Sequence, residues 1–73
     1  EMEEYCFLHL RMKEGIPLDG FRKRYGEGIT HWYGDAVKML KERKLLKEEA
    51  SHLFLTYHGA ALGNFVFEQF LLD

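Results

Sequence analysis

Residues 29–43 read ITHWYGDAVKMLKER. Apolar side chains recur in this stretch every three or four residues, at Ile29, Trp32, Tyr33, Ala36, Val37 and Leu40. That spacing follows the turn of an α-helix and places these side chains on one face. Most of the remaining positions are polar. The pattern therefore predicts an amphipathic helix over about residues 29–43, with its apolar face against a core.

A short β-hairpin is predicted directly after this helix. Residues 45–47 and 52–55 are rich in apolar side chains, and the segment 48–51 between them is mostly polar. Two such runs around a short polar segment are typical of paired antiparallel strands. The turn lacks the Asn-Gly or Asp-Gly pair that fixes the register of many hairpins.

Two further helices are predicted before residue 29. Residues 2–14 contain no Gly or Pro, Gly15 ends that helix, and Pro17 stands near the start of a second helix that ends at Gly26. The first helix carries one apolar stripe made of Met2, Tyr5, Leu8, His9 and Met12, and another made of Cys6, Phe7 and Leu10. Two stripes on one helix require two packing partners.

The last predicted helix covers about residues 57–72, and Thr56 is placed to cap it. Apolar residues surround this helix, and Glu68 is its only charged side chain. We therefore predict one mainly α domain over residues 1–73, a winged-helix-like arrangement of three helices, a short β-hairpin and a C-terminal helix. The first and last helices carry more apolar surface than so short a chain can bury. That excess favours a docking partner, and dimerisation through the last helix is the alternative.

Composition narrows the class of protein. The 73 residues are 47% hydrophobic and 15% aromatic, with a net charge of −2 and one cysteine, Cys6. The aromatic content argues against disorder, and a single cysteine excludes an internal disulfide, which is typical of a reduced cytoplasmic protein. No apolar run reaches the roughly 18 residues that a membrane span requires. The chain starts at Glu1 rather than Met, which favours a domain excised from a larger protein.

The sequence predicts no catalytic residue and no metal site. Cys6 with His9, and His52 with His58, do not have the spacing of a four-ligand metal site. Ser51 lacks a nucleophile motif. His31 and Asp35 lie four residues apart, which more often means a local helix pair than a catalytic dyad.

A stand-alone winged-helix DNA-binding module is the main alternative function. Eight of the ten Lys and Arg residues lie within residues 22–47. In that function the helix at 29–43 would enter the major groove. Its early polar positions, however, include Asp35 and only one cation, Lys38. Nucleic acid is therefore an improbable partner, and a solvated basic face is the simpler interpretation.

Several motifs, in order and over nearly the whole chain, resemble one family. The last is Leu55-Thr56-x-x-Gly59-x-x-Leu62-x-Asn64-x-Val66-x-x-x-Phe70-Leu71. Before it stand Glu4 with residues 5–11, Gly15-Ile16, the run Leu18-x-x-Phe21-x-x-x-Tyr25-Gly26, and Leu40 with Leu45-Leu46. Together they resemble the C-terminal domain of the oxygen-independent coproporphyrinogen III oxidase-like proteins, which are radical S-adenosylmethionine proteins.

This resemblance implies a larger parent protein. In the family, an N-terminal barrel holds a [4Fe–4S] cluster and S-adenosylmethionine on a Cys-x3-Cys-x2-Cys motif, and the C-terminal domain packs against that barrel. The motif is not in this chain, so neither cofactor is expected in it. The family includes an oxidoreductase of porphyrin biosynthesis and a heme chaperone, and the short ending after Phe70-Leu71 leans toward the chaperone branch. Porphyrin or heme would then be met through the parent.

The resemblance and the excess apolar surface lead to one set of docking candidates. We expect the following residues to contribute to the face that meets the barrel: Cys6, Phe7, Leu10, Arg11, Asn64, Phe67 and Phe70. His9 or His58 could serve as a heme ligand.

Two positions depart from the family pattern. Lys44 stands where the family commonly has Gly, so either Lys44 adopts a positive φ or the helix ends differently. Pro17 stands where a serine-type cap is common.

Overall fold

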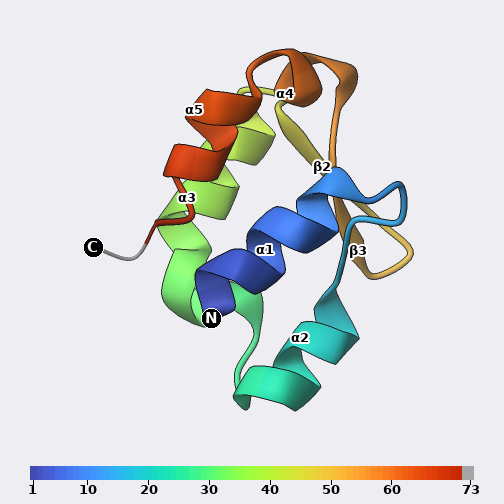
Figure 1. Cartoon of the computed structure of the whole chain (residues 1–73), viewed down its shortest axis with the longest axis vertical. Helices are drawn as coiled ribbons and strands as arrows, with labels where there is room; N and C mark the ends of the chain where they lie inside the picture. Colours follow the sequence, from blue (N-terminus) through green and yellow to red (C-terminus); the bar gives the residue numbers. More distant parts are fainter. Residues whose placement is uncertain (72–73) are drawn as a thin grey trace.

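Within residues 1–71, which the computed structural model describes, helices and strands follow one another as Figure 1 shows. They are α1 (Met2–Arg11), β1 (Ile16–Pro17), α2 (Leu18–Tyr25), α3 (Ile29–Glu42), β2 (Leu46–Glu49), β3 (His52–Leu55), α4 (Tyr57–Ala61) and α5 (Gly63–Glu68). The order up to β3 is that of a winged helix: helix, strand, two helices and a hairpin. The three helices and the hairpin were predicted, whereas β1 was not.

The sheet confirms the hairpin and adds a strand that was not predicted. β3 lies in the middle and pairs antiparallel with β2 on one side and with β1 on the other. Glu49 faces His52 across the turn, and Ala50 and Ser51 both have positive φ (50° and 63°). Residues at both turn positions with φ > 0 make the tight two-residue hairpin for which Asn-Gly is the usual sequence.

α3 has the predicted amphipathic structure. Its buried side chains are Ile29, Tyr33, Val37 and Leu40. The helix is kinked at Tyr33, where φ is −124° and ψ is 24°.

Of the two alternatives that the sequence left open at the end of α3, Lys44 takes the positive φ. Its φ is 64°. The Lys44 N–H donates to the Lys41 carbonyl (3.0 Å), and the Leu45 N–H donates to the Leu40 carbonyl (2.8 Å). These two bonds form a Schellman motif, and the left-handed position of that motif normally belongs to glycine. Lys44 therefore occupies a glycine position.

α1 is shorter than predicted. It ends at Arg11 rather than at residue 14, because Met12 is already extended (φ −86°, ψ 151°). Gly15 then turns the chain with φ 74°, and a Cβ there would lie 2.4 Å from the Leu53 carbonyl oxygen. Only glycine permits this close approach between the turn and β3.

The single helix predicted over 57–72 is wrong. The chain forms two short helices that are separated at Leu62 (φ −110°, ψ 37°), helical structure ends at Glu68, and residue 72 lies outside the described part. Thr56 caps α4 as predicted, because the Gly59 N–H donates to Thr56 Oγ1 at 2.9 Å. The break lets α4 and α5 follow different directions, so that α5 buries Val66 while Leu62 remains half exposed.

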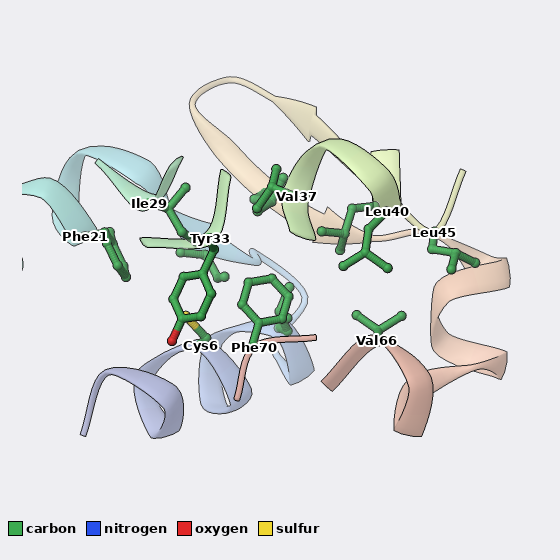
Figure 2. Packing of buried hydrophobic residues seen from close by; sticks show 13 residues of the cluster. Cys6, Phe21, Ile29, Tyr33, Val37, Leu40, Leu45, Val66 and Phe70 are labelled. Carbon is green, nitrogen blue, oxygen red and sulfur yellow. The ribbon is translucent and has the colours of Figure 1, made fainter. Parts of the chain in front are cut away.

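The core lies between α1, α3, the sheet and α5. Figure 2 shows side chains from these helices pointing toward one another, with Cys6 from α1, Val37 and Leu40 from α3, and Val66 from α5. The ring of Phe70, just after α5, lies 5.0 Å from the ring of Tyr33. The contacts of Val66 and Phe70 in the core hold the C-terminal part of the chain on the rest of the domain.

Candidate functional site

The side chains considered for catalysis are a buried thiol and an exposed pair on α3. Cys6 is fully buried, and burial raises the pKa of its thiol to about 12, so it is a protonated packing residue at neutral pH. His31 and Asp35 are both exposed on α3, where they line a shallow surface groove. Among residues 1–71, no three His, Cys, Asp or Glu side chains lie together as a metal-binding group.

Three of the seven docking candidates are misplaced. Cys6 and Phe70 are 0% exposed and Leu10 is 2% exposed, because all three belong to the hydrophobic core of this domain. Cys6 and Leu10 belong to the second apolar stripe predicted on α1, and the domain buries both of them itself. These side chains hold the domain together and offer no surface to another chain.

The other four candidates meet at the surface. The rings of Phe7 on α1 and Phe67 on α5 lie 5.6 Å apart. The guanidinium carbon of Arg11 lies 5.1 Å from the centre of the Phe67 ring, within the range of a cation–π contact. Phe7, Phe67 and Asn64 line a shallow groove of about 270 Å³, together with Glu68 and Leu71.

We call the surface formed by Phe7, Arg11, Asn64, Phe67 and Leu71 the α1–α5 face. Both aromatic side chains are only partly buried, and Leu71 is 52% exposed. An apolar centre with Arg11, Asn64 and Glu68 around it has the composition of a protein interface, apolar inside and polar at the rim. The face can bind an apolar protein surface, and it holds no group for catalysis.

A second surface was not predicted from the sequence. It is a groove of about 530 Å³ between the end of α3 and the break at Leu62, lined by Arg43, Lys44, Leu45, His58, Leu62 and Phe65. We call it the α4–α5 groove. Its signal in the sequence is weak, because the groove exists only where α4 and α5 separate.

Two contacts hold α4 at this groove. Thr56 Oγ1 donates to the Lys44 carbonyl at 2.6 Å, which ties the start of α4 to the end of α3. Gly59 lies so close to the chain that a Cβ there would be 2.0 Å from the Leu45 carbonyl oxygen. The left-handed turn at Lys44 and the glycine at position 59 thus shape the groove together.

The surface that a DNA-binding winged helix would use is weakly cationic. Asp35 and Lys38 are both exposed on α3, so opposite charges share this surface. Lys41 is paired with Glu48 of β2 at 2.6 Å. Phosphate binding relies on cations that are available to phosphate groups. This surface offers few of them.

Within residues 1–71, no helix combines the length and the apolar character needed to cross a membrane.

Comparison with known proteins identifies the family. The family described as HemN C-terminal domain matches residues 1–62. The heme chaperone HemW of Lactococcus lactis subsp. lactis (strain IL1403) is 37% identical over 73 residues, which is all of this chain and 19% of that protein. The heme chaperone HemW of Bacillus subtilis (strain 168) is 35% identical over 71 residues, which is 97% of this chain and 19% of that protein. No solved structure matches.

The chain thus spans about a fifth of the length of these relatives, and both relatives carry the HemW name. The chain belongs to the HemN C-terminal domain family, in its HemW branch.

Proposed function

We propose that the chain is a non-catalytic accessory domain that packs, through the α1–α5 face, against the catalytic barrel of a larger HemN-like protein. The observation that carries this proposal is the contact of Phe7 with Phe67 beneath Arg11 on the surface. Complete burial of an exposed Phe side chain contributes about 1.5–3 kcal/mol. The rings of Phe7 and Phe67 are already partly buried against the core, so docking would add part of that amount for each ring. The relatives, which are about five times longer, leave room for such a barrel.

We further propose that the parent is of the heme chaperone type. Both relatives bear that name, and each matches nearly the whole of this chain. The resemblance implies a radical S-adenosylmethionine barrel with a [4Fe–4S] cluster. An iron–sulfur cluster requires several thiolates, and this chain has one cysteine, which is buried. The residues of this chain do not fit the cluster, and its ligands belong to the rest of the parent.

We place the parent in the cytoplasm. The support is the single thiol, Cys6, which is free and buried. Chains that depend on disulfides for stability are found mainly outside the cytosol.

The docking face is tested by the association of this chain with the rest of its parent, measured by isothermal titration calorimetry. Phe67→Asp puts a carboxylate at the centre of the face and should weaken binding about 30-fold or more, the effect of losing an interface hot spot. Tyr57→Asp is the matched control, because Tyr57 is 91% exposed at the start of α4 and lies outside the face.

Circular dichroism must show both variants folded. Equal affinity of wild type and Phe67→Asp for the barrel would refute the docking face. A Cys-x3-Cys-x2-Cys motif encoded upstream of Glu1 would support the radical S-adenosylmethionine parent, and an upstream region without it would contradict that part of the proposal.

A further inference from the structure

The α4–α5 groove is apolar at its floor. Leu45 is almost fully buried, Phe65 is partly buried, and Leu62 is 52% exposed at the helix break. Its volume of about 530 Å³ lies within the range of roughly 300–1,000 Å³ that is usual for small-molecule sites. A flat apolar molecule laid on these side chains would cover Leu62, which the domain itself leaves exposed.

The rim of the groove is cationic. Arg43 and Lys44 line it, and no Asp or Glu does. The ion pairs among residues 1–71 are Arg24–Glu1, Lys41–Glu48 and Lys47–Glu49, so neither Arg43 nor Lys44 is neutralised by a described residue. The Arg43 guanidinium carbon lies 5.7 Å from the centre of the Phe65 ring, which places positive charge over the apolar floor. This combination is complementary to an apolar molecule with two carboxylates.

The groove also contains an imidazole. His58 is exposed on α4 and lines the groove, and its ring has no hydrogen-bond partner among residues 1–71. A neutral imidazole nitrogen is a common ligand for heme iron. His58 is therefore available as a nitrogen ligand for the metal of a molecule bound in this groove.

We propose that the α4–α5 groove is a binding site for a flat apolar dicarboxylate of the tetrapyrrole class. Arg43 and Lys44 bind its carboxylates, Leu62 and Phe65 contact its ring, and His58 coordinates its iron when the ligand is heme. The identity of the ligand rests on the proposed heme chaperone parent, whereas the site rests on the charges and the shape of the groove. The α4–α5 groove and the α1–α5 face share no residue, so docking and ligand binding are separable.

The test is a titration of hemin into the chain, followed by absorbance in the Soret region. His58→Ala should shift the Soret band and weaken hemin binding by about tenfold or more, because loss of a metal ligand should cost at least as much as the roughly 10–100-fold that is typical for loss of an outer-shell partner. His31→Ala is the matched control, because His31 is exposed on α3 outside the groove, and it should change neither quantity.

Metal-free protoporphyrin IX, whose binding is followed by its fluorescence, keeps the two carboxylates of hemin but lacks the iron. It therefore separates the contribution of Arg43 and Lys44 from that of His58. His58→Ala should leave its affinity unchanged. The double variant Arg43→Gln/Lys44→Gln should weaken both hemin and protoporphyrin roughly two- to thirtyfold, as expected for two exposed ion pairs. The matched control Arg22→Gln/Lys23→Gln removes two exposed cations from α2 and should weaken neither to that extent.

Equal spectra and affinities for His58→Ala and His31→Ala would overturn the proposal, and so would equal affinities for the two double variants. Absence of hemin binding by the wild-type chain would overturn it as well. The titrations are repeated with the full parent, and if the groove variants then match their controls, the parent itself covers the groove and the proposal fails. Phe67→Asp should leave hemin binding unchanged, so failure of this site and failure of docking give different results.

Discussion

Replacing Lys44 by glycine should stabilise the domain. Lys44 holds the left-handed position of the Schellman motif at the end of α3, with φ 64°. The left-handed conformation destabilises a residue that has a Cβ by roughly 1–2 kcal/mol, and glycine avoids this strain. Glycine in turn destabilises the folded chain by about 0.5–1 kcal/mol, because it loses more backbone entropy on folding. Lys44 is exposed and in no ion pair with a described residue, so removing its side chain costs little. The net gain expected is about 0.5–1 kcal/mol.

The assay is urea and thermal unfolding followed by circular dichroism. For a domain of this length, 1 kcal/mol corresponds to a rise in melting temperature of about 4–8 °C. Lys44→Ala is the control, because alanine also removes the charge but keeps the Cβ, and it should change stability by less than about 0.5 kcal/mol. Both variants keep the Lys44 carbonyl that accepts from Thr56. If the two variants prove equally stable, the backbone conformation at Lys44 is not the source of strain, and the reasoning is refuted.

Two further predictions concern buried groups. Tyr33→Phe removes a buried hydroxyl that has no hydrogen-bond partner among residues 1–71. The free energy of unfolding, measured in urea, should therefore stay the same or rise by up to about 1–3 kcal/mol. A clear loss of stability would show that the hydroxyl does form a hydrogen bond. Burial raises the pKa of the Cys6 thiol to about 12 from an ordinary 9.0, so the unfolded chain loses this proton at a lower pH than the folded chain. The contribution of Cys6 to stability should therefore be constant below about pH 9 and fall as the pH rises toward 12. Between pH 9.5 and 10.5, titration of Cys6 should lower the free energy of unfolding by an amount that approaches about 1.4 kcal/mol. In Cys6→Ala, the decrease of stability with pH should be smaller by that amount. An unchanged pH dependence would contradict Cys6 as its cause.

The parts of the fold that follow local rules were predictable. The apolar spacing of α3, the cap at Thr56 and the two strands of the hairpin each depend on residues that are close in sequence. β1 has only two residues, and it is a strand because Ile16 pairs with Leu53, far along the chain. A local pattern cannot contain such a pairing.

The break at Leu62 also depends on tertiary contacts. Gly59 approaches the Leu45 carbonyl and Val66 enters the core, and the chain departs from helical geometry between them at Leu62. The sequence shows an apolar residue at almost every position of this segment, which does not say which of them face inward. The α4–α5 groove arises from that break, and for this reason it was missed.

The docking candidates show the same limit. α1 has two apolar stripes, and periodicity does not tell which one the domain buries for itself. Periodicity does not separate the residues within one stripe either, because Cys6 and Leu10 are buried whereas Phe7 of the same stripe is only partly buried beside Phe67. The α1–α5 face could therefore be predicted only in part: Phe7 and Phe67 from the apolar pattern, and Arg11 and Asn64 from the resemblance.

The measurement that tests the central claim most directly is hydrogen–deuterium exchange, compared between the full parent and the 73-residue chain alone. If the domain packs on the barrel through the α1–α5 face, peptides covering residues 5–11 and 63–69 should exchange more slowly in the parent. The hairpin at residues 46–55 should exchange equally in both. Equal exchange of α1 and α5 in the two proteins, or protection confined to the hairpin, would contradict the docking face.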